Sequence, residues 1–373
     1  MLEASAAFLR ALQERFRLDA LGLVTLLGAD NLRDTYGRLE SPEFAIEDYF
    51  PTLASHVAFD DSILKPLPGF TLYNISDGIK ATDLSAWFTR WLSTQKFTEC
   101  STTLRIEANS IGANRKPIGG LSFPPAFIIV FLFLGLGTIL TGDSIGVLCV
   151  WSLLIASICR ANIVDNCRAT LEDHAMNANP PGTKSDPAKI LVTLPSGQVV
   201  RIKTTKGIAM DCLLTEAKPK YPQDHMFQRI VGWLVFIIHA LTLGMCTLPA
   251  QIFILGALAF FTALVSFRTR SSQHGTQHRI SDHLHITRLD TTGRDTRAKM
   301  FARLELTHKE EQNLVVWFIM PRRSNEVWWN TFKTFKEEAK ADASVLDTWG
   351  ARLAAAYEAN KAREELAQAL MVE

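Results

Sequence analysis

The sequence lacks the features that mark most nucleic-acid-binding proteins and most enzymes. Lys and Arg number 39 and Asp and Glu number 38 among 373 residues, so there is no excess of positive charge to hold a polyanion. No phosphate-binding loop, H-E-x-x-H, G-x-S-x-G or dinucleotide fingerprint is present. The sequence therefore predicts neither nucleic-acid binding nor enzymatic activity, and it indicates no cofactor.

The six cysteines contain no C-x-x-C pair, which excludes the usual spacings of a zinc site or a disulfide framework. Cys212 lies in the segment Gly207–Glu216 without a nearby His or Asn that could activate it, so we interpret it as a buried structural thiol rather than a nucleophile. The N-terminus has no uninterrupted apolar run of signal-peptide length, and its spacing predicts an amphipathic helix over Ala4–Leu27.

Charged residues are almost absent from two long runs. Asp143 is the one charged residue in Leu121–Cys159, and Ile230–Phe267 holds no Lys, Arg, Asp or Glu. A spanning helix needs about 20 apolar residues, and soluble core helices rarely run twice that length with so little charge. Each run breaks near its middle, which predicts a mainly α, polytopic membrane protein with four spans in two hairpins. The predicted spans are 121–140, 144–163, 230–248 and 250–267, the second reaching 163 only if the Arg160 head extends to the membrane interface.

The basic residues predict the orientation of these spans. Lys and Arg number 12 before the first run, 10 between the runs and 17 after the second, and the hairpin tips hold none. Short basic flanks stay in the cytosol, so both termini and the middle loop are expected there. The predicted regions are a cytosolic N-terminal part (1–118), hairpin 1 (119–163), a cytosolic loop (164–229), hairpin 2 (230–267) and a cytosolic C-terminal part (268–373).

The cytosolic parts are expected to be of α+β type, with 1–120 as one mixed domain. Two β-branched runs around Pro195-Ser196-Gly197 predict a β-hairpin over 189–204, which must pack on 1–120 or on the C-terminal part because a lone hairpin is marginal in water. Short strands are expected at Phe70–Tyr73 and Thr102–Ile106, and helices at Leu84–Leu92, Ile163–Met176, Thr296–Leu306, Glu310–Phe318 and from about 334 to the C-terminus.

The polar candidates for function are few. His239 is the one ionisable residue inside a predicted span, and a Ser or Thr on a neighbouring helix, such as Ser152 or Thr262, is its expected partner. Asp143 and Gln251 are expected at the tips, in contact with water. Four glycines are expected to allow close helix contact: Gly135, Gly137, Gly244 and Gly256.

Four histidines gather just after the last span: His274, His278, His283 and His285. The favoured interpretation is a solvated loop entering a strand, and the alternative is a metal site. Farther on, Trp317, Trp328 and Trp329 stand near Arg322 and Arg323. These tryptophans are expected either at the lipid surface or docked on the membrane-proximal domain.

Three segments carry a resemblance to known sequences. The run LPSGQVVRIKTTKGIAMDCLL (Leu194–Leu214), the run RIVGW (Arg229–Trp233) and the run PRRSNEVWW (Pro321–Trp329) resemble segments of uncharacterised multi-spanning membrane proteins of filamentous fungi. The resemblance covers roughly Gly119–Trp329. It implies a multi-spanning membrane protein and assigns no activity or residue role.

These observations favour an interaction or scaffold component that faces the cytosol from an integral membrane position. The expected partners are the lipid bilayer and a protein bound through the C-terminal helix. Two alternatives are a membrane-shaping protein with wedge hairpins of reticulon-like layout, and a transporter or channel subunit, which would require copies of the chain to associate. The membrane is expected to be that of the endoplasmic reticulum or the plasma membrane, and the short spans favour the thinner of the two.

Overall fold

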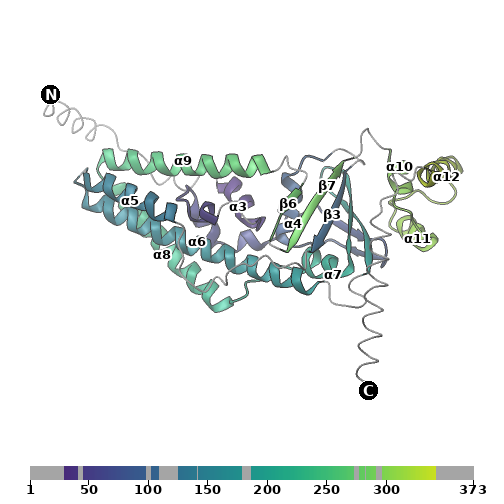
Figure 1. The fold of residues 1–373 in the computed structure, drawn as a ribbon, viewed down its shortest axis with the longest axis horizontal. Helices are drawn as coiled ribbons and strands as arrows, with labels where there is room; N and C mark the ends of the chain where they lie inside the picture. Colours follow the sequence, from purple (N-terminus) through teal and green to yellow (C-terminus); the bar gives the residue numbers. More distant parts are fainter. Residues whose placement is uncertain are drawn as a thin grey trace, which may run out of the picture. The chain divides into compact units, whose positions relative to one another are not determined.

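The computed structural model is mainly helical and contains one β-sheet (Figure 1). It describes residues 29–40, 45–97, 102–108, 125–140, 142–178, 186–272, 277–281, 283–290 and 296–341. The helix predicted over Ala4–Leu27 and the part of the predicted C-terminal helix beyond Ala341 lie outside these residues. The chain divides into two compact units, each assembled from three separate stretches of the sequence.

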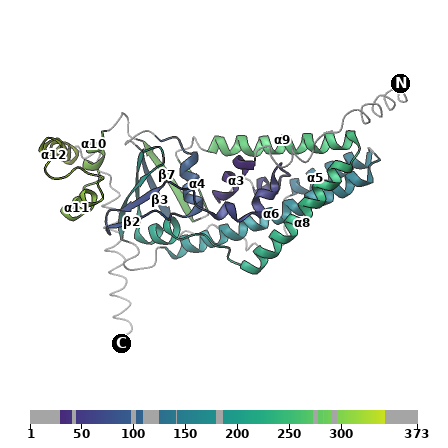
Figure 2. The ribbon, with the colours of Figure 1, turned by 180° about the vertical axis from the view of Figure 1, so that it is seen from behind.

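Unit 1 comprises Met1–Lys65, Asn114–Thr170 and Lys218–His274 and contains the apolar helices (Figure 2). These helices are α5 (Pro125–Leu140), α6 (Ser144–Asn177, in unit 1 as far as Thr170), α8 (Pro222–Met245) and α9 (Leu248–Ser272). Its shorter elements are α3 (Ala29–Gly37) and the 3-10 helices η1 (Ala45–Tyr49), η2 (Ser55–Phe59) and η3 (Asp61–Leu64).

Three of the apolar helices are long and apolar enough to cross a membrane, namely α6, α8 and α9 as far as Phe267. The fourth, α5, is equally apolar but has only 16 residues. Only 33% of the residues in the most apolar windows of α8 and α9 are buried within the protein. Helices whose outward faces carry exposed Ile, Leu and Phe side chains are suited to lipid, where helices satisfy their own backbone polar groups.

Residues 45–64 pack against these apolar helices, which corrects the expectation that 1–120 forms one mixed domain. The ring of Phe50 stacks on Phe261 of α9 at 4.9 Å, and the amide of Leu53 donates to Thr262 Oγ1 at 2.8 Å. The ring of Phe59 lies against Gly232 of α8, where a Cβ atom would meet it at 2.6 Å. Residues 29–65 therefore belong to the helical unit, and the next stretch, Pro66–Ala113, belongs to the other unit.

Of the four glycines predicted to allow close helix contact, only Gly137 does so. A Cβ atom there would lie 2.3 Å from Cε1 of Phe253 on α9, whereas Gly135, Gly244 and Gly256 have no atom within 4 Å. Because real contacts are never that short, the ring of Phe253 must shift to admit even a methyl group.

Gly137→Ala is therefore expected to destabilise unit 1 by about 1–3 kcal/mol through overpacking. Gly135→Ala, two residues away on the same helix, should be neutral or slightly stabilising because Ala favours the helix. Thermal unfolding of the detergent-solubilised protein measures both changes. Adding Phe253→Leu to Gly137→Ala should recover most of the loss, and an equal loss in the two Ala variants would disprove the close contact.

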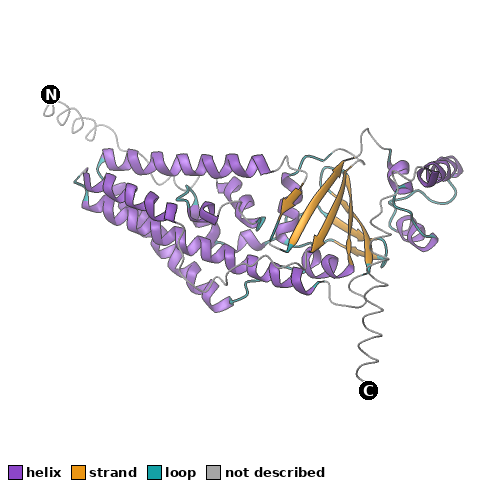
Figure 3. Ribbon diagram, viewed as in Figure 1, coloured by secondary structure: helices purple, strands orange, loops and turns teal. Residues whose placement is uncertain are grey.

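Unit 2 comprises Pro66–Ala113, Leu171–Ala217 and Gly275–Glu373 and contains a seven-stranded sheet (Figure 3). Its order is β2-β1-β4-β5-β3-β7-β6, and every neighbouring pair is antiparallel except β3 and β5, which are parallel. The strands are β1 (Thr71–Asn74), β2 (Ile79–Ala81), β3 (Thr102–Ala108), β4 (Pro187–Thr193), β5 (Val199–Thr205), β6 (Gln277–Arg279) and β7 (Leu284–Asp290).

The predicted hairpin over 189–204 is confirmed as β4 and β5, whose turn contains Gly197 at a positive φ of 81°. It lies inside the sheet, with β1 paired to β4 and β3 paired to β5. Strands β6 and β7 from the C-terminal part complete the same sheet by pairing through β3. The hairpin therefore belongs to a sheet with strands from both regions that were expected as alternatives, 1–120 and the C-terminal part. Because a strand pairs with each side of it, the hairpin has no exposed edge and is not marginal in water.

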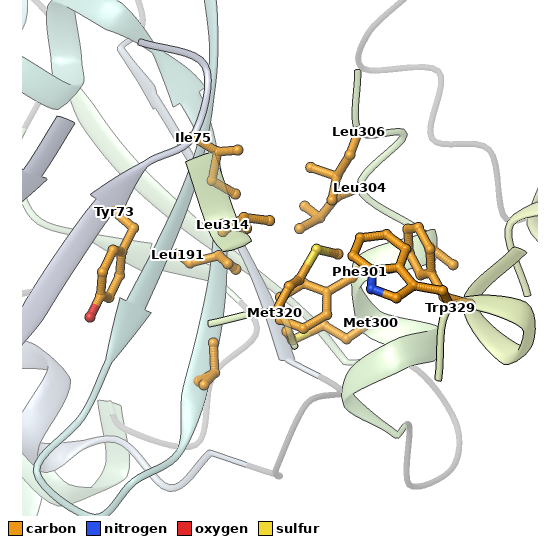
Figure 4. Packing of buried hydrophobic residues seen from close by; sticks show 13 residues of the cluster. Tyr73, Ile75, Leu191, Met300, Phe301, Leu304, Leu306, Leu314, Met320 and Trp329 are labelled. Atoms are coloured by element: carbon orange, nitrogen blue, oxygen red, sulfur yellow. The ribbon is translucent and has the colours of Figure 1, made fainter. Parts of the chain in front are cut away.

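Unit 2 also holds α4 (Ala86–Thr94), the adjoining α7 (Lys206–Ile208) and η5 (Ala209–Leu214), and α10 (Arg297–Ala302), α11 (His308–Val316) and α12 (Glu326–Ala341). Side chains from the last three helices form an apolar cluster with residues of the sheet, including Leu191 (Figure 4). Trp329 is buried in this cluster, Trp328 stacks on Phe332, and Trp317 contacts the ring of Tyr73 at 5.4 Å. These contacts favour the docked interpretation of the three tryptophans over a lipid-surface one.

The stability of this helical cluster is expected to depend on pH through the carboxylate of Glu311 on α11. Burial favours the neutral acid, but hydrogen bonds from Arg323 at 2.8 Å and Lys336 at 3.0 Å hold the pKa of Glu311 below its ordinary value. A carboxylate with a lowered folded-state pKa stabilises the fold above its unfolded pKa, and this stabilisation is lost as the pH falls through the folded pKa.

We therefore expect unit 2 to lose stability on acidification below about pH 4.3, the ordinary pKa of Glu. Glu311→Gln should lower the stability of unit 2 at pH 7 and weaken the decrease of that stability as the pH falls. Unfolding midpoints measured between neutral and acidic pH test this, with Glu326→Gln in the first turn of α12 as the control. Identical acid limbs for wild type and Glu311→Gln would contradict the assignment.

Candidate functional site

The polar side chains of unit 1 gather along one face of α6. Its buried residues include Cys149, Leu153, Ala156, Arg160, Val164 and Cys167, which recur every three or four positions as expected for one face of a helix. Polar partners from the other elements of unit 1 contact this face at three levels: the turn before α6, the level of Cys149, and the level of Arg160 and Arg168.

The turn before α6 is held by the carboxylate of Asp143. Its Oδ1 accepts the amide of Gly146 at 3.0 Å, and its Oδ2 accepts the amide of Thr247, just before α9, at 2.6 Å. One carboxylate therefore lies at the positive N-terminal ends of two helices, one from each predicted hairpin. Gly142 precedes it at a positive φ of 68° and closes the C-terminus of α5.

The expectation that water reaches Asp143 and Gln251 is wrong in this structure. Both side chains are buried, Asp143 in the interaction just described and Gln251 by donating from Nε2 to the carbonyl of Leu243 at 3.0 Å. The amides and carbonyls of helix termini need partners, and these side chains supply them inside the protein.

The intramembrane candidate His239 lies on α8 and is 2% exposed. Its Nδ1 is 3.3 Å from the thiol of Cys149 and 3.3 Å from the carbonyl of the same residue. The predicted partners are both wrong, because Ser152 donates to the Cys149 carbonyl and Thr262 donates to the Leu258 carbonyl. No other described residue is within hydrogen-bond distance of His239 Nε2.

Cys246 joins the same cluster from the end of α8. Its thiol donates to the carbonyl of Thr242 at 3.1 Å, one turn beyond the carbonyl of His239 that the Cys149 thiol approaches at 3.9 Å. His239, Thr242 and Cys246 follow at spacings of three and four residues, which places them on one face of α8. Sequence analysis missed Cys149 and Cys246 because a cysteine in an apolar run packs like any small apolar residue.

Arg160 is buried, which corrects the expectation that its head extends to the membrane interface. Its guanidinium donates to Thr52 Oγ1 at 2.6 Å, to the Asp48 carbonyl at 2.9 Å and to the Phe50 carbonyl, and it lies over the ring of Tyr36 at 5.1 Å. These acceptors come from residues 36–52. The guanidinium thus satisfies carbonyls of a 3-10 segment that would otherwise be buried without partners.

About two turns farther along α6, Arg168 makes a buried ion pair with Asp48. It donates to the two carboxylate oxygens of Asp48 at 2.5 and 3.1 Å, to Asp165 at 3.2 Å and to the Glu40 carbonyl at 2.7 Å. The side chains of Arg168 and Asp48 are only 7% and 11% exposed. Such a bidentate pair is strong and directional, so it fixes Glu40 and Asp48 against α6.

The three described histidines after the last predicted span, His278, His283 and His285, do not come together as one site. His274 lies outside the described residues. His278 is buried in β6 with its ring edge-on to Trp91 at 5.4 Å, which corrects the expectation of a solvated position. His283 Nε2 is 3.9 Å from a Glu172 oxygen, and His285 lies in β7 opposite Glu107 of β3. Among the residues the structure describes, no group of His, Cys, Asp and Glu could hold a metal ion.

Cys212 is buried in η5, as expected for a structural thiol. Burial raises the pKa of this thiol to about 12, so the nucleophilic thiolate is not available at neutral pH. Its carbonyl accepts from Trp87 Nε1 at 2.9 Å and from Ser85 Oγ at 3.1 Å, which ties α4 to η5.

The arrangement in unit 1 therefore offers buried anchoring groups and one cluster of two thiols and an imidazole. Comparisons with known proteins add no assignment: no protein-family model, no curated protein and no solved structure matches this chain.

Proposed function

We propose that this chain is a four-span membrane protein that presents a folded α+β domain at one membrane surface as an interaction or scaffold component. The observation that supports the proposal most is that one sheet contains strands from three stretches of the chain, which the apolar helices separate in the sequence. Strands β1 to β3 precede α5, β4 and β5 lie between α6 and α8, and β6 and β7 follow α9.

A single sheet can form only if all its strands lie on the same side of the membrane. The chain between β3 and β4, and again between β5 and β6, must therefore cross the membrane an even number of times. If only α6, α8 and α9 crossed, the chain between β3 and β4 would cross once, and the bilayer would separate β1 to β3 from β4 to β7. The parity of the crossings supports including the shorter helix α5 as the fourth span.

The length of α5 fits a thin bilayer. Its 16 residues rise about 24 Å at 1.5 Å per residue, against about 30 Å for an average hydrocarbon core. A short span is accommodated by local thinning of the bilayer, and this favours a thin membrane such as that of the endoplasmic reticulum. The basic flanks of the spans, with none at the tips, support a cytosolic position for the sheet.

Cysteine labelling from the two sides of the membrane tests this topology. Ser144 is exposed and Thr247 half-buried, so Ser144→Cys and Thr247→Cys place a thiol at each tip without removing the Asp143 carboxylate or the Thr247 amide that it binds. In chains without other reactive thiols, an impermeant maleimide should label both tips only from the side opposite the sheet. Ser196→Cys in the β4–β5 turn is the matched control and should react only from the side of the sheet.

The labelling pattern separates the proposal from its alternatives. Protection of both tips from either side would indicate wedge hairpins and a membrane-shaping role. Reaction of the tips and of Ser196→Cys from the same side would contradict a membrane-spanning arrangement altogether.

The scaffold role is tested by the neighbours of the folded domain. A biotin ligase fused after Glu373 should label a reproducible set of proteins in cells. A variant with an unfolded sheet but intact spans should lose that set while remaining in the same membrane. An unchanged set of neighbours would show that the folded domain does not recruit them.

A further inference from the structure

The thiols of Cys149 and Cys246 are buried in the helical unit, and Cys149 lies beside the imidazole of His239. Cys149 belongs to α6 and Cys246 ends α8, so the pair connects a helix of the first hairpin with a helix of the second. Both residues are buried, at 0% and 6% exposure, and their thiols lie against neighbouring turns of α8, that of Cys149 3.9 Å from the carbonyl of His239 and that of Cys246 3.1 Å from the carbonyl of Thr242.

His239 adds a proton acceptor to this pair. Its Nδ1 lies 3.3 Å from the Cys149 sulfur, within reach of the thiol proton. In the neutral tautomer with the proton on Nε2, the Nδ1 lone pair points at Cys149, and Nε2 has no partner among the described residues. A thiol beside a base and a second thiol is the arrangement that disulfide formation requires.

We propose that Cys149 and Cys246 form a reversible dithiol–disulfide pair that is oxidised inside the membrane by apolar organic hydroperoxides, with His239 as the proton acceptor for Cys149. Two apolar side chains next to the pair on α8 are exposed, Leu241 at 62% and Met245 at 67%. Because this surface is suited to lipid, we expect the oxidant to be one that dissolves in lipid. The proposal rests on the membrane-spanning part of the proposed function and is independent of the scaffold role.

The chemistry balances in two steps. His239 takes the proton of Cys149, the thiolate attacks the terminal peroxide oxygen, and the O–O bond breaks. This gives a sulfenic acid on Cys149 and an alcohol, which receives the proton from His239. The Cys246 thiol then attacks the Cys149 sulfur, the S–S bond forms, and the hydroxyl leaves as water with the Cys246 proton. Two electrons pass from the two sulfurs to the peroxide, and the disulfide joins α6 to α8.

Differential alkylation of the full chain in lipid vesicles tests the proposal. Free thiols are blocked after treatment with cumene hydroperoxide, the sample is reduced, and newly exposed thiols receive a heavy label that mass spectrometry locates. Cys149 and Cys246 should carry the heavy label together, and the unreduced digest should contain the peptide that links them. Hydrogen peroxide, which is polar, should act more slowly at equal concentration.

Three variants sharpen the result. Cys246→Ser should leave a sulfenic acid on Cys149 that reacts with dimedone, and His239→Gln should slow disulfide formation at least about tenfold, as expected when a general base is lost. Cys159→Ser, at another buried thiol of α6, should change neither. The wild-type result does not depend on whether the variants fold. The proposal would be overturned if Cys149 and Cys246 stayed reduced in the native protein under conditions that fully oxidise a denatured sample. A disulfide from either residue to any other cysteine would also overturn it.

Discussion

Replacing Arg168 with Met is expected to destabilise unit 1 by about 3–5 kcal/mol, because it leaves the Asp48 carboxylate buried without a countercharge. The Asp48 side chain is only 11% exposed, and both of its oxygens accept from Arg168. The loss should show as a lower unfolding midpoint of the detergent-solubilised protein. It should also release residues 40–48 to protease, since the same guanidinium holds the carbonyls of Leu39 and Glu40.

Two further variants decide whether the buried charge is the cause. Asp48→Leu combined with Arg168→Met should recover much of the stability, because it removes the more deeply buried carboxylate together with its countercharge, and the remaining Asp165 carboxylate is 19% exposed. Arg33→Met is the matched control. Its partner Asp30 is 92% exposed, and exposed pairs contribute about 0–1 kcal/mol. A double variant no more stable than Arg168→Met alone would contradict the explanation.

Leu104→Asp is expected to unfold the sheet domain while the spans stay inserted. Leu104 is 0% exposed in β3 and pairs with Ile202 of β5 and Arg288 of β7. A carboxylate in this apolar position must be buried as a charge or neutralised, and either state costs more than about 4 kcal/mol at such a site. Limited proteolysis should then cut unit 2 rapidly, while the tips at Ser144 and Thr247 keep their labelling pattern.

Ser196→Asp provides the control, because it adds the same charge at an exposed position of the β4–β5 turn. It should leave the proteolysis pattern unchanged. If Leu104→Asp resists protease as well as wild type does, then β3 is not at the centre of a packed sheet. If it instead abolishes insertion of the spans, insertion and folding of the sheet are coupled more tightly than we propose.

Local patterns in the sequence located most of the elements. The uncharged runs predicted the apolar helices, and the β-branched runs around Pro195-Ser196-Gly197 predicted β4 and β5. These predictions succeeded because helix and strand periodicity, and the exclusion of charge from lipid, act over about 20 neighbouring residues. The four-span arrangement itself stays a prediction, supported by the parity of the crossings.

The arrangement of the sheet could not be predicted, because strand pairing across long separations leaves no local signal. Nothing in the sequence around Thr103 indicates a parallel partner at Arg201. The same limit explains Arg160, whose position at the end of an apolar run is typical of an interfacial residue. Its burial depends on carbonyls of residues 48–50, far away in the sequence. The resemblance to fungal membrane proteins likewise stays a prediction.

Crosslinking between β3 and β7 tests the central claim most directly, because these strands stand before the first hairpin and after the second. Glu107 and His285 lie directly opposite each other, whereas Arg288 pairs with Leu104 at the other end of β3. In membranes, a short thiol–thiol crosslinker should join Glu107→Cys to His285→Cys and leave Glu107→Cys unjoined to Arg288→Cys, about 10 Å away along the strand. Absence of the first link, with both cysteines labelled from opposite sides of the membrane, would contradict a single sheet built from three segments.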